Sequence, residues 1–473
     1  MHNRIKYILI AFIFFLITSQ LHAQNNHIDS VITSSITHKI KKVTIRNITI
    51  AGNDRTKNYI ILREVPFKKG DSISLEELPK QVEKARELIY NTTLFVNVNV
   101  LSQLPNNDEA DIIINLKERW YIFPVPYVEL ADRSFNEWAK TYNADLKRLS
   151  YGVYFTHFNF TGRRDPFSLI LINGFTRNIS FEYAIPYINK YLTTGLKLGA
   201  GTEQTRQIPY KTTFENKLVY YKNDNFVKNE WFAIAAFTLR KKIKKKETFS
   251  LKFRHIGIAD SIVSFFNPLY FNRGSHHRDF LEFQYKLQFT DVDNVLYPLK
   301  GQTSTFILKK TGLKLNGGIN NFSMEAGIEK YNTLGNKWYV STRINGSIQI
   351  PFTPAYFNAK ALGYKEHYLR GYEYFVIDGF AFGFAKLDLK KQIAHFDIPT
   401  GIKSGTYNKI PFTLYAKTYA DVGGALNHQQ SRLNNKALFS GGFGVDILML
   451  YDIKLSIEFS LNQLGQKGLF LHQ

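Results

Sequence analysis

"WYVSTRINGSIQI", residues Trp338–Ile350, alternates between two kinds of side chain along its whole length. One set of positions is mainly apolar and comprises Trp338, Val340, Thr342, Ile344, Gly346, Ile348 and Ile350, and the other comprises Tyr339, Ser341, Arg343, Asn345, Ser347 and Gln349. Successive side chains of a β-strand point to opposite faces. The stretch therefore predicts a strand with one apolar face and one polar face.

The same alternation returns in four other stretches, at residues 248–255, 280–289, 412–422 and 453–462. Many strands with an apolar outside and a polar inside make up a membrane-spanning β-barrel. A soluble β-sandwich also alternates, but with its apolar face inward. Charged side chains in mid-strand, at Arg343, Lys417, Asp421 and Glu458, and an aromatic content of 15% favour the membrane barrel, which carries aromatic girdles.

The N-terminus has the features of a secretory signal peptide over residues 1–23. A basic start at Arg4 and Lys6 precedes an apolar run at residues 7–17, and "LHA" at residues 21–23 resembles a cleavage site. No later stretch reaches about 18 uninterrupted apolar residues, so helical membrane spans are excluded. The chain of 473 residues has no cysteine, which excludes disulfides and thiolate metal sites.

The formal net charge of the chain is +22. A charge of this size is compatible with solvated loops, and it also suits contact with anionic lipid headgroups at the faces of a membrane. Nucleic acid is not an expected partner, because the signal peptide indicates that the chain is exported.

A small domain is expected over residues 41–118, after a linker at residues 24–40. Strands are predicted at Val43–Ile50, Phe95–Val100 and Ala110–Leu116, and a short helix at Lys57–Glu64. The predicted order is therefore strand, helix, helix, strand, strand, with a second helix following residue 74.

That second helix carries a start signal of its own. Ser74-Leu75-Glu76-Glu77 fits a capping box, in which Ser74 and Glu77 satisfy each other's free backbone donors. Five apolar residues then fall on one helical face: Leu75, Leu78, Val82, Ala85 and Ile89. Pro79 does not fit this start and indicates that the helix could begin later.

The predicted domain resembles a POTRA domain, the polypeptide-transport-associated module found before certain outer-membrane barrels. The matching features are "VTIRNITIAGNDRTKNYIILREV" at residues 43–65, Gly70, and "NTTLFVNVNV" at residues 91–100. The resemblance implies an exposed sheet edge. An incoming unfolded strand could pair with such an edge through backbone hydrogen bonds, with little demand on its sequence.

Residues 119–473 are expected to form the barrel. About 350 residues at about ten per strand, with turns and loops, suit about sixteen strands. We place the turns at residues 161–165 and 297–301 on the periplasmic side. The basic run "RKKIKKK" at residues 240–246 is interpreted as a solvated turn between two strands; the periplasmic side is favoured for it, and the strand count before it leaves that side open. The long loop at residues 259–277 is then expected to face outward.

A second resemblance lies in "YKEHYLRGYEY" at residues 364–374. Arg370-Gly371-Tyr372 is similar to the R-G-[FY] motif in the sixth extracellular loop of the BamA/TamA family. The resemblance implies that this loop folds back into the barrel and that Arg370 meets acidic residues of the inner wall. Asp421, in "YADVG", matches by position, and Asp388, in "FAKLDLKK", matches on a strand whose inward face is ambiguous.

"DNVLYPLKG" at residues 293–301 is similar to a turn of the same family. Asp293, Tyr297, Pro298 and Gly301 are expected to shape this turn, because proline fixes the backbone and glycine permits unusual angles. This motif is given a structural role and no chemical one. The C-terminus departs from the family pattern, since it ends "LFLHQ" without a terminal aromatic residue and its last strand is short. A short last strand predicts weak pairing with the first strand.

The sequence shows no nucleophile elbow, no P-loop and no His-Glu-x-x-His motif. Neighbouring His276 and His277 are interpreted as polar loop residues. We therefore expect no enzyme, no cofactor and no metal site. An outer-membrane lipase remains the enzyme alternative, and it would need a Ser–His pair that the sequence does not identify.

The resemblance to the BamA/TamA family implies a protein of the bacterial outer membrane with its POTRA domain in the periplasm. Its implied function is the insertion or export of other polypeptides, through a seam between the first and last strands. Unfolded outer-membrane or secreted polypeptides, membrane lipid and accessory periplasmic or lipoprotein subunits are the implied partners. Two alternatives stay open: a translocator for one dedicated partner, of the two-partner secretion type, and a passive channel.

Overall fold

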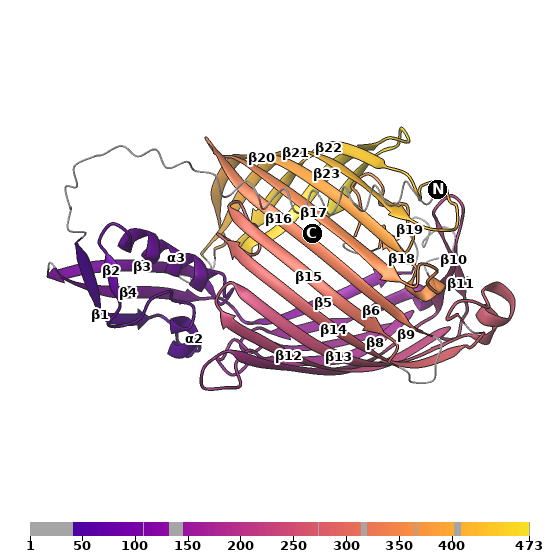
Figure 1. Ribbon diagram of the computed structural model, residues 1–473, viewed down its shortest axis with the longest axis horizontal. Helices are drawn as coiled ribbons and strands as arrows, with labels where there is room; N and C mark the ends of the chain where they lie inside the picture. The colour runs from indigo at the N-terminus through magenta and orange to yellow at the C-terminus, as the bar shows by residue number, and fades with distance from the viewer. Residues whose placement is uncertain are drawn as a thin grey trace, which may run out of the picture. The chain divides into compact units, whose positions relative to one another are not determined.

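Trp338–Ile350 forms strand β17 with the bounds that its alternation predicts. In this computed structural model, β17 belongs to a sheet of sixteen strands that curls into a barrel (Figure 1). Ile348 lies opposite Met324, whose side chain is exposed on the outside, whereas Arg343 forms an ion pair with Glu329. The predicted fold class, a mainly β protein with a barrel of about sixteen strands, is confirmed.

Each strand of the barrel is antiparallel to its neighbours in the sheet. The strands are β5 (Ile122–Leu130), β6 (Leu149–His157), β7 (Phe167–Gly174), β8 (Thr176–Ile185), β9 (Thr194–Thr205), β12 (Lys228–Lys242), β13 (Lys245–Ile258), β14 (His277–Val292), β15 (Gly301–Thr311), β16 (Asn321–Gly335), β17 (Trp338–Ile350), β20 (Ala381–Pro399), β21 (Lys409–Leu426), β22 (Leu438–Met449), β23 (Ile453–Asn462) and β24 (Lys467–His472).

The structure describes residues 41–106, 108–131, 145–272, 274–313, 319–364, 367–401 and 408–472. The predicted signal peptide (residues 1–23) and linker (residues 24–40) lie outside the described residues. Lys42–Gln473 form one compact unit, which contains both the barrel and a small N-terminal domain.

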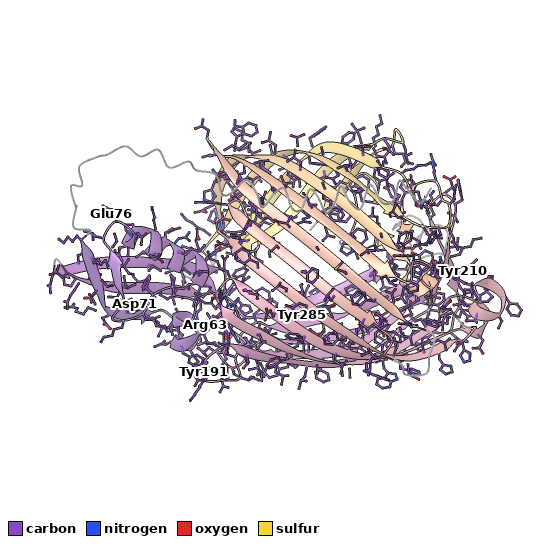
Figure 2. All side chains as sticks on the ribbon, viewed as in Figure 1. Arg63, Asp71, Glu76, Tyr191, Tyr210 and Tyr285 are labelled. Atoms are coloured by element: carbon purple, nitrogen blue, oxygen red, sulfur yellow. The ribbon has the colours of Figure 1, made fainter. Side chains whose placement is uncertain are left out.

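The barrel wall has an apolar outer face and a polar inner face. On β23, Ser456, Glu458 and Ser460 are buried inside the barrel, and Leu461 on the other face is exposed. Large apolar side chains are exposed on the outer face of most strands, including Leu171, Phe181, Leu198, Phe237, Leu251, Phe283, Leu387, Val422 and Phe443. Figure 2 shows the side chains along the wall, with Tyr285 of β14 near its middle. The inward polar face creates the environment for the site described below.

The N-terminal domain packs two helices against one face of a four-stranded sheet. Its elements are β1 (Lys42–Ala51), α2 (Asn58–Leu62), β2 (Ser72–Ser74), α3 (Leu78–Tyr90), β3 (Phe95–Asn106) and β4 (Glu109–Glu118). The strand order is β2–β1–β4–β3, with β1 and β4 parallel. Fully buried Ile45, Ile60, Ile89 and Ile112 lie in its core. Neither helix, nor any other in the described residues, is long and apolar enough to cross a membrane.

The predicted capping box is wrong. Ser74 ends strand β2, where it pairs with Lys42 of β1, and the helix begins only at Leu78. Glu77 occupies the N-cap position without a side-chain hydrogen bond, and Pro79 lies in the first turn. Proline suits that position because the first N–H groups of a helix have no partner within it. Ser74 pairs within the sheet instead of capping the helix. The predicted element order lacked its strand, β2.

Several turns at one end of the barrel contact the N-terminal domain. Arg63, labelled in Figure 2, donates to the backbone oxygens of Leu192 and Arg240 at 3.1 and 2.7 Å. Asn91 donates to Val292 O at 2.8 Å and accepts from Val295 N at 2.9 Å. Lys57 N donates to Gly162 O at 3.0 Å, so the turns near residues 161–165, 240–246 and 297–301 share this end. The loop at residues 259–277 joins β13 to β14 at the opposite end.

That opposite end carries shorter elements. They are the hairpin β10 (Gln207–Thr212) and β11 (Leu218–Lys222), the short π-helix η2 (Ile262–Phe266), the 3-10 turn η3 (Tyr356–Asn358), and the pair β18 (Lys360–Leu362) and β19 (Ile377–Asp378). Two further 3-10 turns, η1 (Leu146–Arg148) and η4 (Leu450–Asp452), precede β6 and β23. The hairpin tip is tied to two loops, since Asn216 accepts from Val376 N at 2.9 Å and from Leu433 N at 3.0 Å.

The sheet ends at β5 on one side and at β24 on the other. Within the described residues, β5 pairs only with β6 and β24 only with β23, so no ladder joins the first strand to the last. The last strand is short, as predicted, and spans six residues. A seam, defined here as the boundary between β5 and β24, therefore remains open along the barrel wall.

Candidate functional site

The loop between β18 and β19 brings Arg370 into the barrel, where only 6% of the residue is exposed. Gly371 has a φ of +82°, a backbone conformation that side chains with a Cβ rarely adopt. Its carbonyl accepts from Asn462 Nδ2 of β23 at 2.6 Å. The glycine thus turns the chain sharply after Arg370 and fastens the loop to the inner wall.

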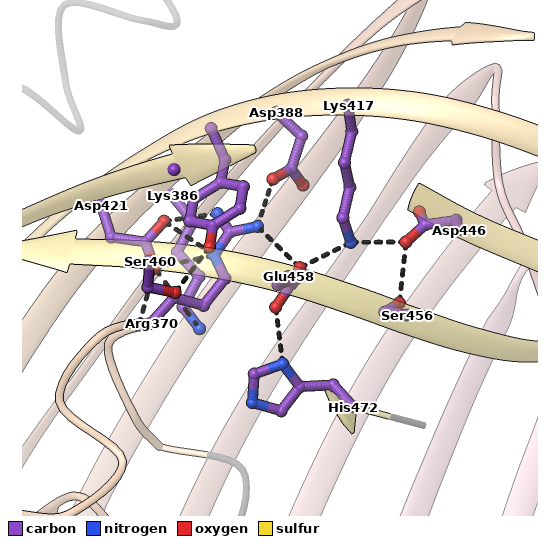
Figure 3. A network of polar contacts seen from close by, with 12 residues as sticks. Arg370, Lys386, Asp388, Lys417, Asp421, Asp446, Ser456, Glu458, Ser460 and His472 are labelled. Carbon is purple, nitrogen blue, oxygen red and sulfur yellow. Dashed lines mark hydrogen bonds and ion pairs between the residues drawn. The ribbon is translucent and has the colours of Figure 1, made fainter. Parts of the chain in front are cut away.

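Arg370 binds Asp421 of β21 through both its backbone and its side chain (Figure 3). The Arg370 backbone N and Nε each lie 3.0 Å from Asp421 Oδ2, and Nη2 contacts the other carboxylate oxygen, Oδ1. This is a planar fork-to-fork arrangement, which gives direction as well as attraction. The structure therefore brings together the two residues that the family resemblance paired.

Asp388 of β20 also faces inward and contacts the same guanidinium. Arg370 Nη1 lies 2.5 Å from Asp388 Oδ1, and Ser341 of β17 donates to Asp388 Oδ2 at 3.2 Å. The face of Asp388 was ambiguous in the sequence because Phe382 and Phe384 share its parity. In the structure those two rings pack against the inserted loop, which explains aromatic side chains on a polar wall.

Tyr419 of β21 covers the guanidinium from a third direction. The Arg370 Cζ lies 3.9 Å from the centre of the Tyr419 ring, a cation–π contact. The Tyr419 hydroxyl is 2.6 Å from Ser460 Oγ on β23. Arg370 is therefore held by groups from β20 and β21, and Tyr419 extends the contact to β23, the strand next to β24.

A wider network joins this arginine to the last strands of the barrel (Figure 3). Lys417 Nζ lies 2.5 Å from both Asp446 Oδ1 and Glu458 Oε1, and Glu458 lies 3.6 Å from Arg370. His472 of β24 is 2.5 Å from the second oxygen of Glu458. The end of the last strand is thus tied to the inserted loop through one buried carboxylate.

The lysine and arginine side chains of the network equal its carboxylates in number. Four cations, Arg370, Lys386, Lys390 and Lys417, lie within 4.0 Å of one or more of four carboxylates, Asp388, Asp421, Asp446 and Glu458. Removing charges from water is costly, and the cost is met only when each has a well-placed partner. The network therefore has little tolerance for the loss of any one member.

Sequence analysis missed part of this network. Lys417 and Glu458 were recognised only as polar residues in mid-strand, and Asp446 and His472 were not singled out. Asp446 is found only once β21 and β22 are in register, because its partner Lys417 lies on the neighbouring strand. The alternation of β22, which places Asp446 on the inner face, was the available signal.

The turn at residues 293–301 reaches the same network. Asp293 Oδ1 accepts from the backbone N atoms of Leu299 and Lys300, both at 3.1 Å, which closes the turn. Gly301 has a φ of +109°, and a Cβ there would lie 2.0 Å from Asp291 O. The Tyr297 hydroxyl donates to Asp446 Oδ2 at 2.8 Å. Tyr297 thus adds a buried contact to the structural role assigned from the sequence.

The remaining motif residues have structural positions. Tyr372 is buried in an apolar cluster with Leu369 and Phe375, and its hydroxyl donates to Phe439 O at 3.2 Å. Pro298 lines a cavity of about 180 Å³ beside the network. Phe470 of the last strand faces inward and its ring centre lies 5.7 Å from that of Tyr374. None of these groups presents a nucleophile beside a base.

A second buried ion cluster lies where the N-terminal domain meets the barrel. Glu64 is 1% exposed, contacts Arg240 through both carboxylate oxygens, and lies 3.5 Å from Arg164. Burial alone would raise the pKa of the Glu64 carboxyl, but hydrogen bonding and attraction from Arg240 outweigh burial, so this pKa lies below its usual value. Glu64 therefore stays charged and fastens the domain to the barrel.

We expect Glu64→Gln to loosen this contact, because two arginines would lose their buried counter-charge. Hydrogen exchange of α2 and of the β12–β13 turn should then accelerate by about tenfold or more, since each 1.4 kcal/mol corresponds to tenfold. Glu83→Gln is the matched control, because Glu83 pairs with Arg86 at the exposed surface. In the unchanged protein, a lowered pKa means that the contact is complete above about pH 4.3 and weakens as the pH falls below it. Equal exchange rates in both variants would contradict this role.

Comparison with known proteins now places the two parts of the chain. Residues 43–119 match the family model described as POTRA, surface antigen variable number repeat. The chain carries a POTRA domain. The expectation from "VTIRNITIAGNDRTKNYIILREV" is thereby confirmed, and the POTRA domain precedes the open barrel. No curated protein matches the chain in sequence.

Solved structures are also similar to this chain. CdiB from Escherichia coli is 11% identical with a TM-score of 0.54, over 91% of this chain and 75% of that chain. BamA from Haemophilus ducreyi lacking POTRA domains 1–3 is 15% identical with a TM-score of 0.49, over 91% and 83%. CdiB from Acinetobacter baumannii is 13% identical with a TM-score of 0.47, over 91% and 73%. The likeness to CdiB from Escherichia coli shows that this chain shares the overall fold of that protein.

Proposed function

We propose that this protein is an outer-membrane factor that inserts or assembles other polypeptides, with its POTRA domain in the periplasm. The observation that carries the proposal is the seam, where β5 and β24 have no partner strand on their outer sides within the described residues. The exposed apolar outer face supports a membrane location, since lipid is the environment that such a face suits.

The seam suggests a source of energy for insertion. Backbone N–H and C=O groups without partners are costly in a bilayer, and an incoming strand would satisfy those at the seam. The client polypeptide would at the same time satisfy its own groups. No nucleotide is required, and we propose no catalytic residue, cofactor or metal.

The POTRA domain supports an earlier step, in which a client strand is received before it reaches the seam. β3 is an edge strand of the POTRA sheet, and its outer side has no paired strand in the described part of the domain. Leu101 and Leu104 on β3 are exposed. An extended polypeptide could add to this edge through main-chain hydrogen bonds, with apolar contacts to these leucines.

Arg370 and its network are proposed to hold the C-terminal side of the seam in place. The loop binds β21 through Asp421 and β23 through Asn462, and Glu458 carries the connection to His472 of β24. Strands that border an open seam lack the support of a full ladder. Buried ion pairs from inside the barrel would supply part of that support.

Depletion of the protein from cells tests the proposed function against its alternatives. Insertion predicts that several other outer-membrane barrels decline together in the membrane fraction. Loss of one secreted protein alone would instead support a dedicated translocator of the two-partner secretion type. Unchanged protein localisation with slower uptake of small solutes would support a passive channel and would overturn the proposal.

A further inference from the structure

The two strands that border the seam present unlike backbone edges. β5 contains two prolines, Pro124 and Pro126, two positions apart. Proline has no N–H group, so a strand tolerates it only where that group would face away from the neighbouring strand. The direction in which these positions face therefore decides what the free edge of β5 can bind.

Two hydrogen bonds that continue the β5–β6 ladder fix this direction. Phe158 N donates to Tyr121 O at 2.9 Å, and Ala131 N donates to Arg148 O at 2.8 Å. Because bonding alternates along an antiparallel pair, the odd-numbered residues of β5 face β6. The residues whose N–H and C=O groups face the seam are therefore the even-numbered ones: Ile122, Pro124, Pro126, Val128 and Leu130.

The middle of the β5 edge consequently lacks donors at two successive bonding positions. A strand that paired there would keep two of its carbonyl groups without a partner, in a region where water is scarce. The same gap hinders closure of the seam by β24. Natural sheets use proline on exposed edges to prevent unwanted pairing, and β5 has this property at its centre.

The edge of β24 has no such gap. Asn462 N donates to Gln466 O at 3.1 Å at the start of the β23–β24 pairing. By the same alternation, Gly468, Phe470 and His472 bond toward β23. The residues that face the seam are Lys467, Leu469 and Leu471, and each has both an N–H and a C=O group.

The side chains of β24 also suit a membrane strand as its neighbour. Leu469 and Leu471 are 69% and 68% exposed on the outer face, where they continue the apolar surface of the barrel. On the inner face, His472 is held by Glu458 at 2.5 Å. β24 therefore offers complete backbone bonding on a strand that the Arg370 network keeps in position.

We propose that an incoming strand is added to the edge of β24, and that the prolines of β5 prevent its addition on the opposite side. The expected occupant is an extended segment of a membrane-barrel polypeptide with alternating side chains, whose apolar residues lie beside Leu469 and Leu471. This inference rests on the proposed function and assigns the strand-receiving edge within it. Because the β5 edge lacks two backbone donors, the client pairs weakly with β5 and can separate from the barrel on that side.

Photo-crosslinking tests this assignment in the full-length protein folded in phosphatidylethanolamine–phosphatidylglycerol vesicles. The photoreactive residue p-benzoylphenylalanine replaces either Leu469 or Val128, which lie on the outer face at the two sides of the seam. The probe is a biotinylated peptide with the sequence of residues 453–462, an alternating strand of this chain. We expect labelling from position 469 to exceed labelling from position 128 by at least tenfold.

A backbone variant gives the second measurement. Leu471→Pro removes one N–H group from the β24 edge and should lower labelling from position 469 several-fold, whereas Leu471→Ala keeps that group and should not. Heat-dependent gel mobility establishes that each variant is folded. Preferential labelling from position 128 would overturn the edge assignment while leaving strand reception intact. Labelling from neither position would contradict the proposed function itself.

Discussion

Replacing Arg370 with alanine is expected to lower the free energy of unfolding of the barrel by about 3–5 kcal/mol, the usual cost of removing one partner from a buried ion pair. Asp421 and Asp388 would lose their shared guanidinium, and among the other cations of the network only Lys386, at 4.0 Å, would still pair with Asp421. Urea unfolding of the protein in lipid vesicles, followed by heat-dependent gel mobility, measures the change.

The matched control is Arg432→Ala. Arg432 pairs with Glu215 at 2.7 Å, but both side chains are about half exposed, so the expected loss is below about 1 kcal/mol. Asp421→Ala should destabilise the barrel to a similar extent as Arg370→Ala, and the double variant should lose much less than the sum. Additive losses, or a loss for Arg370→Ala no larger than that of the control, would remove the proposed pairing.

Restoring the missing donors of β5 is expected to have the largest effect on function. In a Pro124→Val/Pro126→Val variant, two N–H groups would face the seam and could bond to β24. Two such bonds contribute about 1–3 kcal/mol together. A change of this size lowers the population of the open seam by roughly 5- to 150-fold. Client insertion into vesicles should slow by a similar factor while the barrel itself becomes more stable.

The control for this variant is Val128→Ile, which alters a side chain on the same edge and leaves every backbone donor in place. Insertion should continue at the rate of the unchanged protein. If the double valine variant inserted clients as fast as this control, the prolines would have no part in keeping the seam open. Limited proteolysis of both variants would show whether either had lost its fold.

Strand positions in this protein were predictable because alternation is a local property. Trp338–Ile350 has the same bounds in the sequence and in the structure, since a wall between an apolar exterior and a polar interior requires a two-residue period. The capping box failed for a non-local reason. Ser74 pairs with Lys42 of a strand that lies about thirty residues earlier. A helix-start motif gives no information about such pairing between distant segments.

The candidate site was predictable only in part. Arg370 and Asp421 came from the family motif, and the inner face of β21 agreed with them. The sequence could not show which face of β20 carries Asp388. Its aromatic neighbours on that strand face inward because they pack against the inserted loop, and the position of this loop cannot be predicted from the sequence. Asp446 depends on the register between β21 and β22, which also lies beyond local pattern.

Pro124 and Pro126 illustrate a further limit. Both are visible in the sequence, but their meaning depends on which way the N–H positions of β5 face. The ladder with β6 supplies that direction, and only then do the prolines mark the seam. A proline at a position whose backbone N points toward β6 would instead have removed a hydrogen bond from the β5–β6 ladder.

The distance across the seam tests the central claim most directly. The chain has no cysteine, so spin labels can be placed at Val128→Cys and Leu469→Cys without further changes. Phe443→Cys with Phe459→Cys is the reference, because these residues lie directly opposite each other on paired strands. In vesicles, pulsed electron paramagnetic resonance should give a longer and broader distance for the seam pair than for the reference. A single short distance equal to the reference would show a closed wall and would contradict the account.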